Sequence, residues 1–558
     1  MLFQSLKSIV TNIPDKYLLL FIIAIGLLLR TINLTIGFPI LYASGDEAVY
    51  HLSALNMLAS KTLFTLGNYG PLGAYLQIPF IALASFVLFI TGKIHSISDL
   101  EFLIVTHEGY FLFIPRVISA LFGVLAILVS YKLARLLFYK KEVALFSSLL
   151  TAASYNLVLI SHQARPWSEA VFFSIVAVYW AVKAVKTKNK FPKYVLVSFF
   201  FSAVSFGFHQ FGAMSALLIC LIIFFSELKI KKYIRGLLAG LTFYTMIVFV
   251  LNLVSLGSKV FRILDPTNRS DSVELVKLNI TDLNSFLNAG KSILNVFFTD
   301  PIIILFFVIF ALTKYKKHGI HRAFILFFVI NILIWVLFFP PLSRYLLISF
   351  CFLPVLAGYV FYEFVLRVRY RHLFFVIVMI LTFFNSVYFN LVLVQTSTYD
   401  LIRQWLDQNI EKSTPLVATS HRYYGYVPNA LVIKKVQEMN PGYYGRAAKL
   451  SGNTYADNVR DIMYANAIST AGDSKVNYTN KALLISNSRI VIDNYNSSSD
   501  RLLELDPKRY RLVAHFSPTG SKIYDTDIPE ALFDTTAIFP YFRLIRPGPY
   551  IDVLGVID

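Results

Sequence analysis

The sequence predicts a mainly α-helical, polytopic membrane protein with an extracytoplasmic α/β domain at its C-terminal end. Of its 558 residues, 56% are hydrophobic and only 15% are charged, a composition that excludes a soluble enzyme. About eleven runs of seventeen or more mostly apolar residues occur along the chain. Each is long enough to cross a hydrocarbon core of about 30 Å as a helix. These runs stop near residue 395, so we expect a transmembrane domain over residues 1–394 and a soluble domain over residues 395–558.

The positive charge is concentrated in the apolar part of the chain. Residues 1–394 contain 33 of the 51 Lys and Arg and 15 of the 32 Asp and Glu, an excess of 18, whereas the remaining residues have an excess of 1. This excess lies in short loops between apolar runs, the pattern of cytoplasmic loops, so it does not indicate nucleic-acid binding. The two cysteines, Cys220 and Cys351, lie in apolar runs and form neither a disulfide framework nor a zinc motif.

Basic loops set the expected topology. They lie near residues 132–141, 183–193, 229–235, 314–322 and 367–371, and we place all of them and the N-terminus in the cytoplasm. Counting crossings between them gives eleven helices, near residues 17–36, 111–133, 142–161, 167–185, 193–208, 212–227, 233–256, 296–313, 322–339, 344–365 and 373–394. This count leaves the C-terminal domain outside the cell, beyond a plasma (inner) membrane.

One apolar stretch, Leu72–Ile90, does not fit this alternation. A full crossing there moves every later basic loop to the outside, unless the region Asp99–His107 also contains a crossing. Gly70, Pro71, Gly73 and Pro79 also weaken its first half as a regular helix. We therefore expect residues 37–110 to form one large external segment in which this stretch is re-entrant or lies in the membrane interface.

The C-terminal region has the pattern of a small α/β domain. Tyr399–Ile410 is expected to be helical, with Leu401, Trp405, Leu406 and Ile410 near one face. A second helix is expected over Tyr455–Ala467. Short strands are expected at Leu416–Thr419, Ala430–Ile433, Ala482–Ile485, Tyr510–Phe516 and Lys522–Tyr524.

Two adjacent acids, Asp46 and Glu47, follow the first apolar run. They are placed at the start of a short amphipathic helix whose dipole favours negative charge. Its apolar residues are expected to rest on the membrane: Leu52, Leu55, Met57 and Leu58. Two interpretations are open. The acids either cap the helix, or one carboxylate acts as a base for a hydroxyl acceptor, assistance worth about 10²–10⁴-fold in rate.

Three arginines are placed at the same external end: Arg116, Arg165 and Arg344. Each taken singly is explained by snorkelling to the bilayer surface. Together with the acidic pair they favour a site that binds a phosphate, because a guanidinium binds phosphate with two parallel hydrogen bonds. Arg30, inside the first apolar run, is expected to snorkel outward or to pair with an acid.

Two histidines are also placed outside. His51 lies four residues after Glu47, a spacing that suits either a shared metal ion or an ordinary hydrogen bond, and metal dependence stays open. His209 interrupts an apolar run and marks an external turn. The sequence contains no P-loop, dinucleotide fingerprint or serine nucleophile elbow, so no site for a soluble nucleotide is visible.

This arrangement resembles the GT-C membrane glycosyltransferases, particularly the branch of the protein O-mannosyltransferases and the lipid A aminoarabinose transferases. The resemblance extends over residues 17–394 and rests on five segments: Asp46-Glu47 with Tyr50-His51, Gly70-Pro71-Leu72, Arg116 to Gly123, Ala164-Arg165-Pro166 and Arg344-Tyr345-Leu346. The sequence departs from that pattern at Pro166-Trp167, where relatives often have an acid.

The resemblance implies an inverting transferase that moves a sugar from a polyprenyl phosphate or diphosphate to an acceptor outside the cell. It implies Asp46, assisted by Glu47, as catalytic residue, and the three arginines as ligands of the donor phosphate. Substrate contacts are expected from Tyr50, His51, His209 and Tyr345. The partners it implies are the bilayer, the lipid-linked donor and a protein, lipid or glycan acceptor.

Two other functions are compatible with eleven crossings. A multi-pass transporter or flippase is expected to hold ionisable residues near the middle of the bilayer, and to have paired halves with broken helices. The sequence halves do not repeat. A non-catalytic scaffold on the same fold is the second alternative, because a fold does not by itself prove a function.

Overall fold

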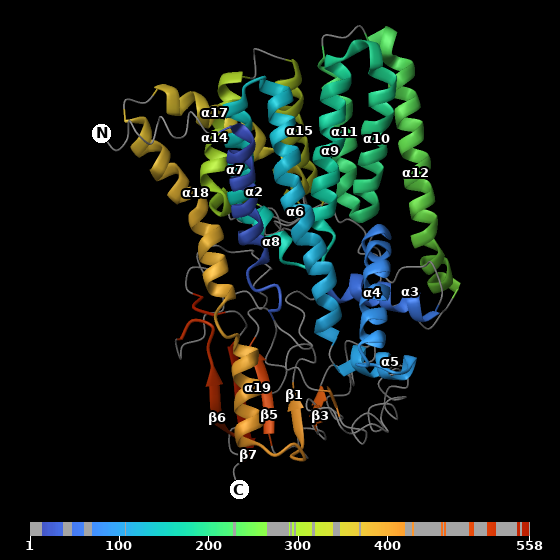
Figure 1. Cartoon of the computed structure of the whole chain (residues 1–558), viewed down its shortest axis with the longest axis vertical. Coiled ribbons are helices and arrows are strands. Elements are labelled where there is room, and N and C mark those ends of the chain that lie inside the picture. Colours follow the sequence, from blue (N-terminus) through green and yellow to red (C-terminus); the bar gives the residue numbers. More distant parts are fainter. Residues whose placement is uncertain are drawn as a thin grey trace.

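The computed structural model describes residues 14–36, 47–60, 70–106, 108–226, 230–264, 297–314, 319–338, 346–367 and 370–418, with shorter segments that include the C-terminal strands. The chain forms a bundle of long helices above a small sheet (Figure 1). Among the described residues, seven helices are long and apolar enough to cross a membrane, or eight when one bent pair is counted as a single span. The predicted mainly α-helical, polytopic membrane fold is confirmed.

Every predicted crossing coincides with helical structure. The helices of the bundle are α2 (Asp15–Thr31), α6 (Glu108–Phe138), α7 (Lys141–Ala153), α8 (Tyr155–Ser161), α9 (Trp167–Lys186), α10 (Phe191–Phe208), α11 (Met214–Phe224), α12 (Ile230–Leu264), α14 (Pro301–Lys314), α15 (Gly319–Phe338), α16 (Leu347–Phe350), α17 (Leu353–Arg367) and α18 (Arg371–Leu393). The helix α12 continues to Leu264, beyond the predicted end at residue 256. Part of the expected external segment 257–295 is therefore helical.

Small residues and aromatic rings fill the space between these helices. Gly240 of α12 lies against Phe199 and Val195 of α10, and a Cβ atom built at Gly240 would come within 2.5 Å of the Phe199 ring. Five buried serines form hydrogen bonds through their hydroxyls, either with another serine hydroxyl or with a backbone carbonyl: serines 174, 198, 202, 205 and 215. Close approach and satisfied polar groups are what helix packing in a bilayer requires.

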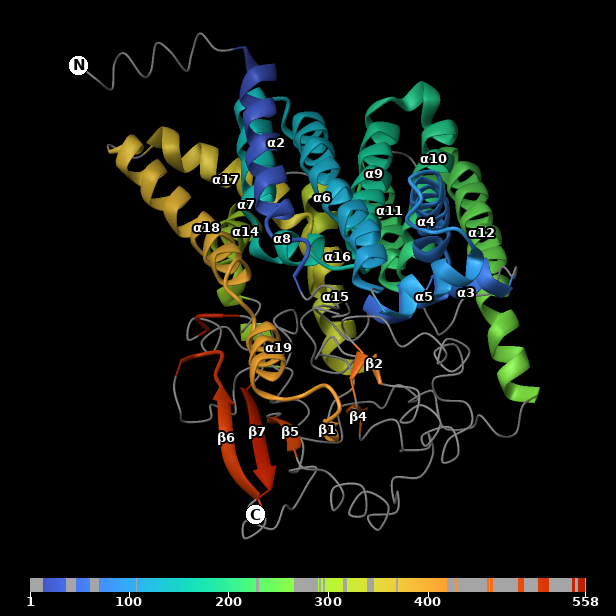
Figure 2. The same cartoon turned by 60° about the horizontal axis from the view of Figure 1, so that its bottom comes forward.

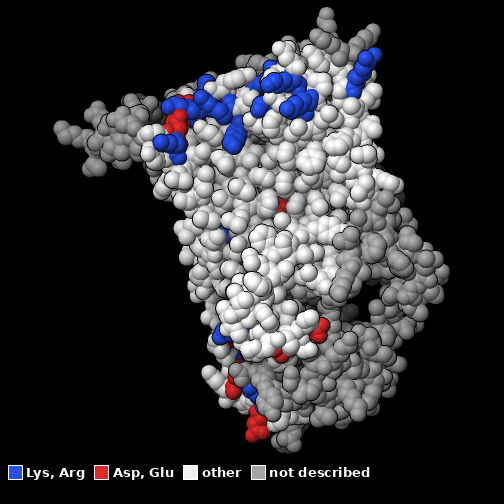
Figure 3. All heavy atoms as spheres, turned by 45° about the vertical axis from the view of Figure 1, so that its right-hand side comes forward, with Lys and Arg blue, Asp and Glu red and all other residues white. Residues whose placement is uncertain are grey.

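The basic connections lie together at one end of the bundle. Figure 3 shows Lys and Arg gathered along that end, next to a broad surface of uncharged residues. The ammonium of Lys186, at the end of α9, donates to the carbonyls of Leu136 and Leu137 at the end of α6. Lys141, at the start of α7, pairs with Asp15 at the start of α2 at 3.2 Å. The chain thus alternates between a basic end and an opposite end, as the charge pattern predicts.

The segment that we expected to be external contains three described helices, α3 (Glu47–Ser60), α4 (Leu72–Ile90) and α5 (Ile97–Thr106). The helix α5 has 10 residues and is only about 15 Å long, too short to cross a bilayer. Figure 2 shows α4 almost end-on, whereas α9 and α10 are still seen from the side. The axis of α4 is therefore inclined to the axes of these helices. This inclination agrees with a re-entrant or interfacial stretch.

Two details of this segment differ from prediction. The helix α4 is regular from Leu72 through Pro79, because Pro71 precedes its first turn and the gap left by Pro79 is tolerated in an apolar helix. Leu55 and Met57 of α3 do not rest on the membrane. They are buried in a cluster with Ala74 and Ile81 of α4 and Phe111 of α6, so α3 packs on protein.

The first helix carries a buried arginine. Arg30 is fully buried and donates hydrogen bonds to the carbonyls of Gly26, Ala152 and Thr151 at 3.0–3.1 Å. The expectation that it snorkels outward is wrong. Its charge is held inside the bundle because α7 ends beside it and presents carbonyls that have no partner within their own helix.

Beyond α18 the chain forms α19 (Thr398–Asn409) and a five-stranded sheet of order β4-β1-β5-β7-β6. The strands are β1 (Leu416–Ala418), β4 (Ile462–Tyr464), β5 (Ile490–Tyr495), β6 (Tyr510–Phe516) and β7 (Tyr550–Val556), with a separate pair of β2 (Val427–Pro428) and β3 (Val459–Arg460). The strand β1 is parallel to β4 and β5, whereas β7 is antiparallel to β5 and β6. The predicted sheet in this region is confirmed.

Several predicted elements of this region need correction. Tyr455–Ala467 is not a helix where it is described, because β3 and β4 lie there. The strands β5 and β7 were not predicted. The buried residues of α19 include Ile402 and Leu406, so the inward face is shifted from the one expected. The expected strands at Ala430–Ile433, Ala482–Ile485 and Lys522–Tyr524 lie outside the described residues.

The sheet docks on the end of the bundle that lies away from the basic loops. Leu544 and Tyr550 are buried in one cluster with Leu29 of α2, Tyr155 of α8 and Phe389 of α18. The Tyr388 hydroxyl donates to the Leu544 carbonyl at 2.9 Å. The C-terminal region is therefore in direct contact with the helices that surround α8.

Candidate active site

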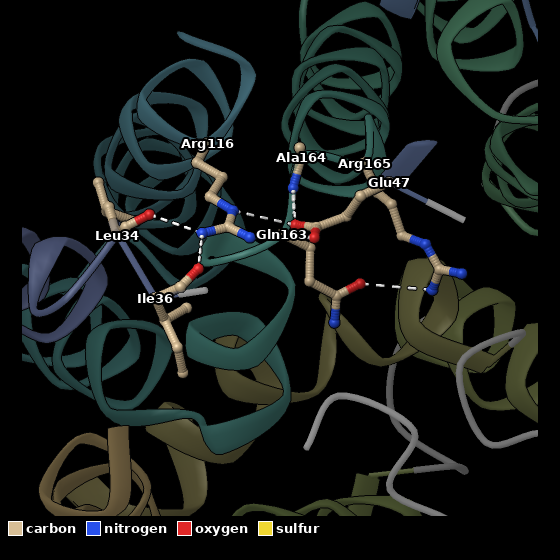
Figure 4. Close-up of polar contacts among 7 residues, drawn as sticks. All are labelled: Leu34, Ile36, Glu47, Arg116, Gln163, Ala164 and Arg165. Carbon is tan, nitrogen blue, oxygen red and sulfur yellow. Dashed lines mark hydrogen bonds and ion pairs between the residues drawn. The ribbon is translucent and has the colours of Figure 1, made fainter. Parts of the chain in front are cut away.

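The candidate site is built around Glu47, the first residue of α3. Its carboxylate accepts two hydrogen bonds from the Arg116 guanidinium of α6, from Nε at 3.2 Å and from Nη2 at 3.1 Å. It also accepts one from the amide of Ala164 at 2.7 Å. Figure 4 shows these contacts converging on one carboxylate. Glu47 thus joins Arg116 to the segment 162–166, whereas the sequence had predicted Arg116 as a ligand of the donor phosphate.

The Arg116 guanidinium is fully engaged on its other side. Its Nη1 donates to the carbonyls of Leu34 at 2.8 Å and of Ile36 at 2.7 Å, just after the end of α2. The Arg116 and Glu47 side chains are both completely buried. A buried ion pair is stable only where hydrogen bonds satisfy its remaining atoms, and these two carbonyls and the Ala164 amide do so. The pair ties four segments of the chain together.

Arg165 turns away from this pair. Figure 4 shows its guanidinium directed to the opposite side of Gln163, whose side-chain oxygen lies 3.4 Å from the Arg165 Nη1. Arg165 is also almost completely buried. The cationic groups of Arg116 and Arg165 therefore face different surroundings.

Tyr50 and His51 lie on the next part of α3. Tyr50 is buried beside Gly73 and Pro166, where a Cβ atom built at Gly73 would come within 2.9 Å of the Pro166 side chain. A glycine at this position therefore allows α4 to approach the segment 162–166. Tyr50 of α3 and the loop that carries Ala164 thus both lie beside Gly73.

His51 forms a hydrogen bond to protein and takes no part in a metal cluster. Its Nδ1 lies 3.3 Å from the Gln77 side-chain oxygen, and the Gln77 amide donates to the Gly73 carbonyl at 3.1 Å. Burial, with a smaller contribution from the Arg116 charge, lowers the pKa of His51 to about 4, although the hydrogen bond to Gln77 acts in the opposite direction. No group of three potential metal ligands occurs in the described part of the chain. Glu47 is already paired with a cation, so the Glu47–His51 pair does not fit a metal ion.

His209 lies behind the loop 162–166 and not in an open turn. Its ring stacks on Trp167 with centroids 3.7 Å apart, and its Nδ1 accepts the amide hydrogen of Phe211 at 3.3 Å. His209 therefore packs on the residue that directly follows Pro166. The sequence predicted the turn at His209 correctly, but it gave no sign of the contact with Trp167.

One acid of the site was missed. Glu169, on the first turn of α9, is buried and accepts a hydrogen bond from Ser119 at 3.3 Å, and the same hydroxyl lies 3.0 Å from the Arg165 carbonyl. Ser119 belongs to the segment from Arg116 to Gly123. The sequence departs from its relatives at Pro166-Trp167, where they often have an acid, and the acid two residues after Trp167 is the signal that could have identified Glu169.

Three predicted site residues lie outside the described residues: Asp46, Arg344 and Tyr345. Asp46 directly precedes Glu47 in the sequence. Leu346 and the short helix α16 follow Arg344 and Tyr345, and Leu346 is buried.

A pocket of about 310 Å³ lies beside Leu34, whose carbonyl accepts a hydrogen bond from Arg116. It is lined by the end of α2 and the first half of α6: Thr31, Asn33, Leu34, Thr35, Phe113, Val117, Ala120 and Leu121. Leu34 belongs both to this pocket and to the hydrogen bonds of Arg116. Phe113 and Leu121 are exposed on the outside of the bundle, so the pocket opens on the apolar surface.

Residues 111–254 match the family described as dolichyl-phosphate-mannose-protein mannosyltransferase. This match confirms the resemblance to the GT-C glycosyltransferases. It covers α6 to α12 and therefore includes Arg116, Ala164, Arg165 and His209. No curated protein sequence matches the chain.

Solved structures of two proteins resemble the chain at low sequence identity. ArnT from Cupriavidus metallidurans in the apo state is 12% identical, with 73% of this chain and 83% of that chain covered and a TM-score of 0.47. The archaeal oligosaccharyltransferase AglB from Archaeoglobus fulgidus, in complex with an inhibitory peptide and a dolichol-phosphate, is 12% identical, with 98% and 88% covered and a TM-score of 0.46.

Proposed function

We propose that this protein is an integral-membrane, inverting glycosyltransferase that takes a sugar from a polyprenyl-phosphate donor and transfers it to an acceptor at the end of the bundle away from the basic loops. The family matched by residues 111–254 is described by a dolichyl-phosphate-linked mannose. That description supports a monophosphate carrier and a mannose-like sugar for this chain. Basic loops mark the cytoplasmic side of a membrane protein, so the reaction takes place outside the cytoplasm.

The observation that carries this proposal is the position of Glu47. A carboxylate that is buried against Arg116 and the Ala164 amide fixes the first residue of α3 at the external end of the bundle. We infer that Asp46, the residue before Glu47 in the sequence, acts at this end of the bundle, where the helices, the outer surface of the membrane and the segment 162–166 meet. This is the place where a lipid-linked headgroup and a water-exposed hydroxyl come together.

In the proposed reaction Asp46 is the base. It removes the proton from the acceptor hydroxyl while the hydroxyl oxygen bonds to C1 of the sugar. The bond between C1 and the phosphate oxygen breaks, and its electron pair leaves with the polyprenyl phosphate. Attack from the face opposite the phosphate inverts C1. Proton removal during bond formation contributes about 10²–10⁴-fold to such a rate.

We assign the cations of the site different parts in this reaction. Arg165 and Arg344 are proposed to stabilise the departing phosphate, as oriented cations do for a developing negative charge. Arg116 is not free for that task, because Glu47 and two backbone carbonyls occupy its guanidinium. Its proposed role is to position Glu47 and, through the adjacent backbone, Asp46.

Three of the predicted substrate residues, Tyr50, His51 and His209, lie near this site. Tyr50 and His51 continue α3, and His209 supports the loop through Trp167. The pocket beside Leu34 opens on the apolar outer surface of the bundle, so the isoprenoid chain of the donor is proposed to approach there. Residues 395–558 are proposed to form an external domain that contacts the acceptor.

One observation bears on the alternative of a transporter. Broken helices and charges inside the bundle are typical of transporters, and α7 and α8 are bent by 55° next to Arg30 and Asp300. These two side chains, however, are hydrogen-bonded to the ends of α7 and α8. Because Arg30 and Asp300 satisfy backbone groups at the break, they serve the structure of the bundle and do not indicate a transport path. This observation favours the transferase.

The proposal is tested by mass spectrometry of glycolipids and glycoproteins from cells with and without the gene. The expected result is a product class that carries an added hexose only when the gene is present. Identical glycan profiles, together with gene-dependent uptake or flipping of a lipid-linked sugar, would instead support the transporter.

A further inference from the structure

The helix formed by α7 and α8 is broken inside the bundle at Ser154. The two parts, Lys141–Ala153 and Tyr155–Ser161, are bent by 55° relative to each other. A break leaves carbonyls at the end of the first part and amides at the start of the second without partners in their own helix. Buried polar groups that stay unpaired are costly, so other segments must supply partners.

Arg30 and Ser386 satisfy the carbonyl side. The Arg30 guanidinium donates to the carbonyls of Thr151 and Ala152, each at 3.0 Å, and the Ser386 hydroxyl of α18 donates to that of Ala153 at 2.6 Å. A cation at the carboxyl end of a helix also complements the helix dipole. Gly123 of α6 leaves room for this arginine, since a Cβ atom there would come within 3.0 Å of the Arg30 Nε.

Asp300 satisfies the amide side. Its carboxylate accepts hydrogen bonds from the Tyr155 amide at 2.8 Å, the Ser154 hydroxyl at 2.7 Å, and the Asn156 amide and side chain at 3.3 and 2.9 Å. Thr299, the preceding residue, accepts a second hydrogen bond from the Asn156 side chain at 2.7 Å. Asp300 lies just before α14, far from α8 in the sequence.

The short helix α8 leads directly into the candidate active site. It ends at Ser161, and the next residues include Ala164, whose amide bonds to Glu47, and Arg165. The Ser161 hydroxyl lies 3.3 Å from that of Ser168 on α9. A shift or a rotation of α8 therefore moves the amide that holds the carboxylate next to Asp46.

We propose that Asp300 and Arg30 are positioning residues of the transferase: they fix the bend between α7 and α8 and so place the loop 162–166 against Glu47. The effect on transfer rests on the proposed function, whereas the effect on the loop does not. A displacement of about 1 Å in a reacting group costs up to about 10²-fold in rate. The loss of either charge is therefore expected to lower kcat more than it changes KM.

The first test is Asp300→Asn in the full-length protein in lipid nanodiscs. The substitution keeps the volume of the side chain. It replaces one carboxylate oxygen by an NH2 group, which cannot accept the hydrogen bonds that Ser154, Tyr155 and Asn156 donate. The expected result is hydrogen exchange at least about tenfold faster over residues 155–164, with no change over residues 171–186. Asp15→Asn is the matched control, because Asp15 forms an exposed ion pair with Lys141 at the basic end, and it should leave both segments unchanged.

Transfer kinetics separate positioning from general destabilisation. Asp300→Asn should lower kcat at least about tenfold. Combined with Glu47→Gln it should add little further loss, because both changes act on the Ala164 contact. Residues that act independently instead give multiplying losses. Wild-type exchange and kcat in a folded Asp300→Asn protein would overturn the proposal, as would losses that multiply.

A milder variant decides the case in which Asp300→Asn does not fold. Ser154→Ala removes one of the four hydrogen bonds to Asp300 and should show the same pattern at smaller amplitude. Unchanged exchange over residues 155–164 in Ser154→Ala would then overturn the proposal. If the wild-type protein transfers no sugar while the exchange pattern holds, the proposed function fails and the positioning of the loop stands.

Discussion

Glu47 and Arg116 face each other through two parallel hydrogen bonds, 3.2 and 3.1 Å long, and neither side chain is exposed. The two residues lie far apart in the sequence, one at the start of α3 and the other in α6. Because their contact is bidentate, it fixes orientation as well as distance. The pair fixes the first residue of α3 against α6.

Glu47→Gln should destabilise the protein strongly. It leaves the Arg116 guanidinium buried beside a neutral group, a change that typically costs about 3–5 kcal/mol. The thermal midpoint of the purified protein measures this effect. The matched control is Glu363→Gln, which breaks a partly exposed pair with Lys140 and should cost no more than about 1 kcal/mol. Equal shifts for the two variants would show that the Glu47 pair has no special role.

Gly123→Ala should also destabilise the bundle, because the added Cβ atom would come within 2.2 Å of the Ser161 hydroxyl and 3.0 Å of Arg30. Overpacking of this kind costs about 1–3 kcal/mol. Gly290→Ala is the control, since nothing lies within 4 Å of that position. The comparison is a pair of thermal unfolding curves, and a Gly123→Ala protein as stable as Gly290→Ala would contradict the close approach of α6 to α8.

The stability of the protein should depend on pH through His51. Burial lowers the pKa of this histidine from 6.5 to about 4. Between these two values the unfolded chain binds a proton that the folded chain excludes, so stability rises with pH from about 4 to about 6.5. His51→Gln should flatten this part of the profile, whereas replacement of the exposed His95 by Gln should not. A wild-type slope in His51→Gln would refute the assignment.

The proposed orientation is tested by cysteine labelling in intact cells. Asn409→Cys, at the exposed end of α19, should react with an impermeant reagent. Lys190→Cys, in the basic connection between α9 and α10, should react only after permeabilisation. The two native cysteines are replaced beforehand so that they do not react. The reverse labelling pattern would place the basic loops outside and refute the charge argument.

The sequence predicted the long helices and the basic end well, because apolar length and loop charge determine both of these features directly. It also placed Glu47, Arg116 and Arg165 at the same end of the bundle, but it assigned Arg116 to the donor phosphate and did not predict its pair with Glu47. It did not predict that Arg116 is fully occupied, because the carbonyls of Leu34 and Ile36 carry no signature in the sequence. Asp300 was missed for a similar reason: its partners are mostly amides and hydroxyls at a helix break that only the fold creates.

The C-terminal region was predicted less well. Its strands are short, and the strands β5 and β7 pair across long connections, so no local alternation identified them. Tyr455–Ala467 has helical periodicity, but β4 pairs with β1 and this tertiary pairing overrides the local preference.

The central claim is that the carboxylate next to Glu47 is the base of a sugar transfer. The most direct measurement is the transfer of a radiolabelled sugar from polyprenyl phosphate by purified Asp46→Asn protein, with Asp99→Asn as control at an exposed acid of α5. We predict that Asp46→Asn folds normally but loses at least about 10²-fold in rate, while Asp99→Asn keeps the wild-type rate. A folded Asp46→Asn protein with the full wild-type rate would contradict the account.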